Sequence, residues 1–149
     1  MPSRSTVFRK LMETRKQITA RGWAFARGPY GGYTVGMSRH EGHPELLVAM
    51  MCDEHVERLL LALTRQIASG RRFAPGDVIE VEGVIATFVA VDRPRECVLL
   101  ADQLYRVPGG PPVRALQVVV RDQEGWPWDP AYAATRSRDL LGSRPAWAA

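Results

Sequence analysis

A histidine and a carboxylate flank a proline in the segment Gly42-His43-Pro44-Glu45-Leu46. Side chains at positions i and i+2 of an extended backbone point to the same face, and proline favours an extended residue before it. His43 and Glu45 could therefore meet, and the carboxylate would hold the imidazole in one tautomer for general acid/base chemistry near neutral pH. The alternative is structural: His43 hydrogen-bonds its loop, and Glu45 binds an arginine or a backbone donor. The sequence favours the structural alternative and leaves the catalytic pair open.

Four further side chains are candidates for binding a small ligand: Tyr33, Gln117, Asp122 and Trp128. A glutamine inside an apolar strand either satisfies a buried backbone group or lines a pocket. If the strands that hold Tyr33 and Gln117 are neighbours, these side chains could surround one cleft together with His43 and Glu45. Aromatic walls with a few polar groups are typical of small-molecule sites. A buried polar network beside a Trp-Pro corner explains the same residues at least as well.

Side chains of the types that bind zinc are present, but their spacing matches no known zinc motif. They are His40, Glu41, His43, Glu45, Cys52 and His55. We therefore expect no metal site, and nothing in the sequence indicates a cofactor. Cys52 ends an apolar run and Cys97 lies among apolar residues, so both are predicted to be buried free thiols.

Positive charge is concentrated at the N-terminus. Residues 1–27 carry seven basic side chains and one acid, whereas the rest of the chain carries 13 bases and 15 acids. A basic helix could neutralise nucleic-acid phosphates, here through Arg9, Lys10, Arg15 and Lys16. A solvated helix face with its apolar side packed on the domain is the favoured alternative. The expected partner is a small molecule or a protein of unknown identity. No association with a membrane is expected.

The pattern of apolar residues predicts alternating groups of strands and helices. Helices are expected at 5–20, at 95–106 and from an N-cap at Asp53 to a stop at Gly70. Strands are expected at 23–26, 33–37, 45–51, 78–81, 84–91 and 115–120. Runs of adjacent strands between helices favour an α+β fold with a mainly antiparallel sheet and two or three helices on one face.

The length of 149 residues fits a single domain. Residues 1–21 are expected to be a basic amphipathic helix that belongs to the domain, 22–131 to be its α+β body, and 132–149 to be a flexible tail. No apolar stretch is long enough to span a bilayer, and no secretory signal is recognised. We therefore expect a cytoplasmic protein.

Several short segments together resemble the bacterial domain-of-unknown-function 4262 family over roughly residues 17–131. They are Gly22-Trp23, Tyr33-Thr34-Val35-Gly36-Met37, Gly42-His43-Pro44-Glu45-Leu46, Gly70 with Phe73 and Pro75-Gly76, Ala115-Leu116-Gln117-Val118-Val119, and Asp122 with Gly125 and Pro127-Trp128-Asp129-Pro130. Arg121 and Trp126 depart from the family's usual residues, so the loop that holds Asp122 could be shaped differently. The resemblance implies a small cytoplasmic bacterial domain without a known reaction, cofactor or ligand.

Two functional hypotheses follow. The first is a non-catalytic module that binds a small ligand or a protein. The second is a small enzyme that uses His43 and Glu45 as an acid/base pair in a cleft lined by Tyr33, Gln117 and Trp128. The oligomeric state is not predicted.

Overall fold

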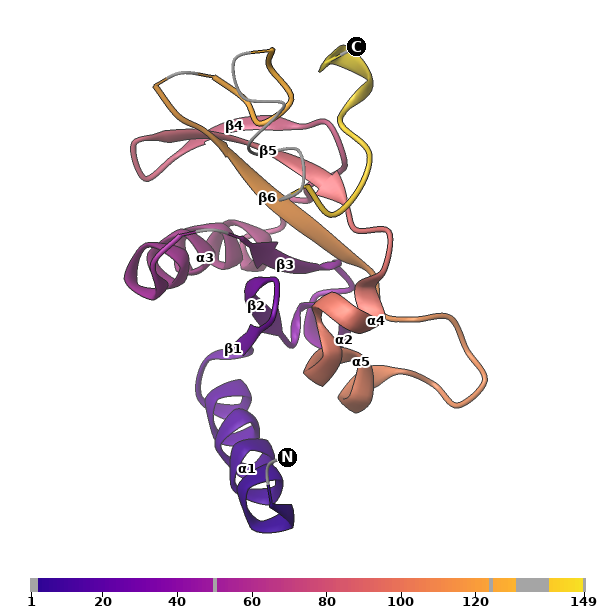
Figure 1. Ribbon diagram of the computed structural model, residues 1–149. Coiled ribbons are helices and arrows are strands. Elements are labelled where there is room, and N and C mark those ends of the chain that lie inside the picture. The colour runs from indigo at the N-terminus through magenta and orange to yellow at the C-terminus, as the bar shows by residue number, and fades with distance from the viewer. Residues whose placement is uncertain (1–2, 50, 124, 131–139, 149) are drawn as a thin grey trace.

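A computed structural model describes residues 3–49, 51–123, 125–130 and 140–148, and one mixed sheet runs through them (Figure 1). Its six strands are β1 (Ala24–Gly28), β2 (Gly31–Val35), β3 (Glu45–Val48), β4 (Val78–Val81), β5 (Val84–Ala90) and β6 (Ala115–Arg121). They lie in the order β1-β2-β3-β6-β5-β4, and only β3 and β6 among these neighbours are parallel. Two antiparallel three-stranded units therefore join along the β3–β6 seam.

The first helix precedes β1, and the other α-helices connect the strands. They are α1 (Arg4–Arg21), α2 (Met37–His40), α3 (Asp53–Ala68), α4 (Pro94–Cys97) and α5 (Leu99–Tyr105), followed by a short 3-10 turn, η2 (Ala146–Ala148). No helix in the described part of the chain is both long enough and apolar enough to cross a membrane.

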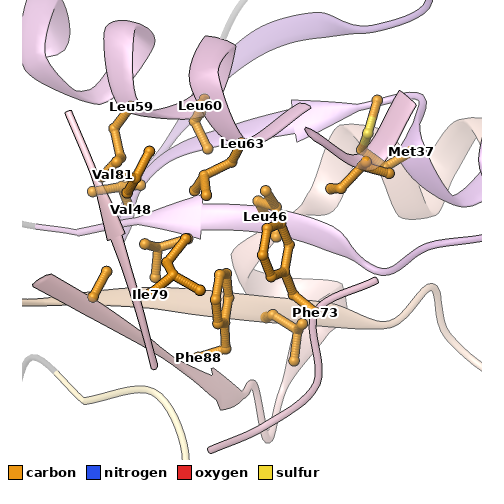
Figure 2. Close-up of a cluster of buried hydrophobic side chains, with 14 of the residues drawn as sticks. Met37, Leu46, Val48, Leu59, Leu60, Leu63, Phe73, Ile79, Val81 and Phe88 are labelled. Atoms are coloured by element: carbon orange, nitrogen blue, oxygen red, sulfur yellow. The ribbon is translucent and has the colours of Figure 1, made fainter. Parts of the chain in front are cut away.

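One face of the sheet is covered by α3. Its predicted apolar stripe is buried and recurs with helical periodicity at Val56, Leu59, Leu60, Leu63 and Ile67. These side chains pack on β3, while β4 and β5 complete the cluster (Figure 2). The strands and the loop after α3 contribute further buried residues to this cluster, including Leu46, Val48, Phe73, Ile79, Val81 and Phe88.

The opposite face carries α1, α4 and α5. Leu47 belongs to this second cluster although its neighbours Leu46 and Val48 belong to the first, as the alternation of side chains along a strand requires. Leu11 and Ile18 of α1 pack against the second cluster. The predicted α+β class is confirmed, but the helices cover both faces, because strands such as β3 are buried on both sides.

Several local boundaries differ from the sequence prediction: the strands expected at 33–37 and 45–51 end at Val35 and Val48. The helix expected at 95–106 is broken at Val98, whose φ of −124° and ψ of 51° are not helical, so α4 and α5 are separate. The N-cap of α3 is Cys52, and Asp53 is the first helical residue. Cys52 is exposed, so the prediction of a buried thiol is wrong there, whereas Cys97 is buried.

The last described segment, 140–148, packs on the domain. The backbone of Leu141 accepts a hydrogen bond from the Asp92 N–H at 2.9 Å, and the Trp147 indole donates to the Gly76 carbonyl at 2.9 Å. Leu141 and Trp147 are thus hydrogen-bonded to other parts of the domain, and the flexible tail expected at 132–149 stays a prediction. Residues 132–139 of that tail lie outside the described residues.

Candidate functional site

The carboxylate of Glu45 accepts five hydrogen bonds from the end of β2 and the start of the four-residue helix α2. The backbone N–H groups of Gly36, Met37 and Ser38 donate to it at 3.3, 3.0 and 3.0 Å. The hydroxyls of Thr34 and Ser38 donate at 2.9 and 2.5 Å. Both oxygens of this fully buried side chain are thus occupied by the turn between β2 and β3.

Burial raises the pKa of Glu45, and the hydrogen bonds from Ser38, Thr34 and Met37 act in the opposite direction. A buried carboxylate with several donors is costly to remove, because each donor would lose its acceptor. The role that this geometry supports is structural: Glu45 holds the chain as it passes from β2 through α2 into β3.

Both ring nitrogens of His43 form hydrogen bonds with backbone groups. Nδ1 lies 2.8 Å from the Pro44 carbonyl oxygen and donates to it, whereas Nε2 accepts the N–H of Phe73 at 3.0 Å. These two bonds fix the neutral tautomer with its proton on Nδ1. Burial lowers the pKa of His43, which favours the same neutral form. The ring also meets Phe73 edge-on, at a centroid distance of 6.0 Å.

The catalytic alternative requires His43 and Glu45 to contact each other, but the hydrogen bonds of both side chains go to other partners. Each side chain is held by a different segment, and their exposed fractions are 1% and 0%, so neither reaches solvent. A general base needs a free acceptor within reach of its substrate. The catalytic role of this pair stays a prediction, and the hydrogen-bond geometry argues against it.

The other candidates are divided among separate places. The Tyr33 hydroxyl accepts the N–H of Leu100 at 3.1 Å, on the face that carries α4 and α5. The indole of Trp128 stacks on Trp126 at 5.4 Å, and Trp147 meets both rings edge-on at 5.6 Å. Tyr33 and Trp128 thus do not share one cleft with His43. Within the described ranges, no three potential metal ligands gather.

Gln117 and Asp122 do lie at one cavity, of about 300 Å³, which we call the β3–β6 cleft. Its described walls are Val48, Ala49, Met51, Gln117, Val118, Val119, Val120, Asp122, Pro127 and Leu140. Gln117 and Asp122 are its polar side chains, and the remaining wall residues are apolar. Of the ligand residues expected from sequence, the structure brings these two together.

The cleft exists because the two parallel strands have different lengths. β3 and β6 pair from Glu45 with Ala115 to Leu47 with Gln117, after which β3 ends at Val48 and β6 continues to Arg121. The carboxyl ends of both strands point toward the cleft. In open α/β sheets, such crevices beyond the carboxyl ends of parallel strands are the usual ligand sites, and the β3–β6 seam reproduces that arrangement locally.

The two polar residues of the cleft are held in place. The side-chain oxygen of Gln117 accepts the N–H of Leu141 at 2.8 Å. Asp122 forms an isolated β-bridge with Gly125, and the carboxylate of Asp129 caps the following turn through the N–H of Trp126 at 2.7 Å. The Trp-Pro corner predicted from sequence therefore helps to fix the position of Asp122.

Sequence reasoning missed the partners that decide these roles. The roles of Thr34 and Ser38 were not predicted, although two hydroxyl residues placed two positions either side of Gly36 are typical of a capped turn. The N–H of Phe73 and the N–H of Leu141 are backbone groups, and no residue type could have revealed them.

Residues 17–133 match one family model, whose description is Domain of unknown function (DUF4262). The match covers most of the chain, including β1 to β6, and it leaves the first three turns of α1 outside. No curated protein and no solved structure matches the chain.

Proposed function

The chain belongs to the DUF4262 family, and we propose that it is a non-catalytic domain that binds a small ligand in the β3–β6 cleft. One observation carries this proposal: a cavity of about 300 Å³ lies beyond the carboxyl ends of β3 and β6, with Gln117 and Asp122 in its wall. A concave, largely apolar site with a few fixed polar groups is the usual form of a small-molecule site.

The position of the cleft in the sequence supports a role shared by the family. Apart from Leu140, each of its described wall residues lies within the matched segment, 17–133. The cleft is therefore built from the same part of the chain as the family-like segments around Tyr33 and His43.

The walls suggest the chemistry of the ligand. A carboxylate accepts hydrogen bonds from amines or hydroxyls, and the Gln117 amide can both donate and accept. The valines and Pro127 favour an apolar portion beside these groups. The volume is at the lower end of the range for small-molecule sites, so the expected ligand is a small amine or polyol with an apolar part.

The alternative, an enzyme based on His43 and Glu45, has less support. Both side chains lie outside the β3–β6 cleft, and their hydrogen-bonding atoms are bound to the backbone and to Thr34 and Ser38. The proposal therefore assigns them to the scaffold that positions β3.

Fragment binding mapped by NMR tests the proposal. Small amines, amino alcohols and polyols are titrated into ¹⁵N-labelled protein, and the shifted amides are assigned. We expect the shifts to centre on Gln117, Val119 and Asp122, and Asp122→Asn to weaken the best amine about tenfold. Asp92→Asn is the matched control, because it removes an exposed carboxylate outside the cleft. Shifts that centre elsewhere, or binding that Asp122→Asn leaves intact, would overturn the proposal.

A further inference from the structure

A second cavity, of about 430 Å³, lies on the opposite side of the molecule's sheet from α3. It is enclosed by the first half of α1, by the turn between β1 and β2, and by α4 and α5. We call it the α1–α5 cavity. It shares no wall residue with the β3–β6 cleft.

The attachment of α1 explains why this space is open. The second half of the helix is fastened to the sheet: Thr14 is buried, and the Gln17 side chain accepts the N–H of Phe25 at 3.2 Å. The first half carries Thr6 and Lys10, which are exposed and line the cavity. Figure 1 shows α1 extending away from the sheet toward its N-terminus. The helix thus forms an outer wall without filling the space beneath it.

The inner walls of the α1–α5 cavity are apolar. Tyr33, Cys97 and Leu100 are buried members of the second core cluster, and Leu11 packs against that cluster from α1. The hydroxyl of Tyr33 accepts the N–H of Leu100, so the phenol is fixed in the wall. Leu99 lines the cavity and has an exposed fraction of 52%. The mouth of the cavity therefore presents an apolar surface.

The mouth of the cavity carries two cations and one acid: Lys10, Arg27 and Glu96. Arg27 forms an ion pair with Asp53, whereas Lys10 has no ion pair with any residue in the described part of the chain. An ammonium group beside an apolar cavity complements a ligand that has an anionic end and an apolar body.

We propose that the α1–α5 cavity binds a single-chain anionic amphiphile of the fatty-acid type. Its carboxylate pairs with Lys10, and its alkyl chain lies against Leu11, Tyr33 and Leu100. The wall residues on α1 precede the segment that matches the family, whereas the other wall residues lie within it. This site is independent of the ligand proposed for the β3–β6 cleft.

The head group provides the first test. Dodecanoate, dodecanol and dodecyltrimethylammonium, each below its micelle concentration, are titrated into the full-length protein by calorimetry. We expect dodecanoate to bind at least about tenfold more tightly than the ammonium compound, which corresponds to about 1.4 kcal/mol. Equal affinity for the three head groups, or no binding of dodecanoate, would overturn the proposal.

Variants locate the site. Lys10→Gln should weaken dodecanoate about tenfold and leave dodecanol unchanged, whereas Lys16→Gln, an equal loss of charge on an exposed position of the same helix, should change neither. Leu99→Trp should block the mouth and abolish binding, and Val107→Trp, at another exposed apolar position that lies outside the cavity, should not. Circular dichroism confirms that each variant is folded. Dodecanoate binding that survives both Lys10→Gln and Leu99→Trp would contradict the assignment.

Discussion

The Nε2 atom of His43 accepts a hydrogen bond from the backbone N–H of Phe73, which lies thirty residues further along the chain, at 3.0 Å. This bond joins the loop before β3 to the loop after α3. Because the same ring donates to the Pro44 carbonyl, His43 fixes the start of β3 relative to the end of α3. The segment that identifies the family most readily is thus a buried connection between two loops.

Replacing His43 with glutamine should reduce the dependence of stability on pH. Burial lowers the pKa of His43 from its ordinary value of 6.5, so the unfolded chain takes up a proton more readily than the folded protein. The stabilisation from this group is present above pH 6.5 and is lost as the pH falls below it toward the lowered pKa. Urea unfolding between about pH 7 and about pH 5 should show a steeper loss of unfolding free energy for the wild type than for His43→Gln.

The matched control for that experiment is His40→Gln, because His40 is exposed on α2. Its pH dependence should follow that of the wild type. An unchanged slope in His43→Gln would mean that the imidazole is not held neutral by its two backbone bonds.

Removing the Glu45 carboxylate should destabilise the protein strongly. In Glu45→Ala, three backbone N–H groups of the turn and two hydroxyls lose their acceptor. We expect a loss of about 3–5 kcal/mol in the free energy of unfolding, measured by urea denaturation. Glu80→Ala, which removes an exposed carboxylate on β4, should cost less than about 0.5 kcal/mol. Similar losses in the two variants would contradict a structural role for Glu45.

The tight approach of the β1–β2 turn to β3 can be tested at Gly31. A Cβ atom there would lie 2.2 Å from the Val48 carbonyl oxygen, and the φ of +144° is itself unfavourable for alanine. Gly31→Ala should therefore cost about 3 kcal/mol or more in unfolding free energy. Gly83→Ala isolates the backbone effect, because Gly83 has a φ of +75° and open space around it, and should cost about 1 kcal/mol. Equal costs would show that β2 and β3 are not as close as described.

The cluster of Trp126, Trp128 and Trp147 can be used to test whether the segment 140–148 packs on the domain. Trp147→Phe removes the indole that donates to the Gly76 carbonyl and meets Trp126 and Trp128 edge-on. We expect the near-ultraviolet circular dichroism to lose intensity and the free energy of unfolding to fall by about 1–2 kcal/mol. A spectrum that changes only by the contribution of one isolated indole would indicate that Trp147 is not packed on the pair.

The helices and strands were predictable where a repeating pattern marked them. The stripe from Val56 to Ile67 has the 3.6-residue period of a helix with one buried face, and α3 forms there. The strands at 78–81 and 84–90 are similarly defined by alternation and by β-branched residues. The break at Val98 was not predictable, because the apolar residues on both sides of it are compatible with one continuous helix.

The candidate site was predicted only in part because sequence does not give strand order. The expected cleft required the strand of Tyr33 to lie beside that of Gln117, but β3 lies between β2 and β6. His43 was recognised as a residue with a special role, yet its partner is a backbone N–H donor that any residue at position 73 except proline would supply. Gln117 and Asp122 line the same cleft because Gln117 lies on β6 and Asp122 directly follows that strand.

The central claim is that the β3–β6 cleft is the ligand site, and blocking it is the most direct test. Ala49 is half-buried in the cleft wall, so Ala49→Phe should fill part of the cavity, whereas Ala20→Phe places the same side chain on the exposed surface of α1. Calorimetry with the tightest-binding amine from the fragment titration should show binding to the wild type and to Ala20→Phe, and none to a folded Ala49→Phe. If Ala49→Phe does not fold, Asp122→Asn takes its place, with an expected tenfold weakening. Undiminished affinity in the blocked or charge-neutral variant would contradict the assignment of the cleft.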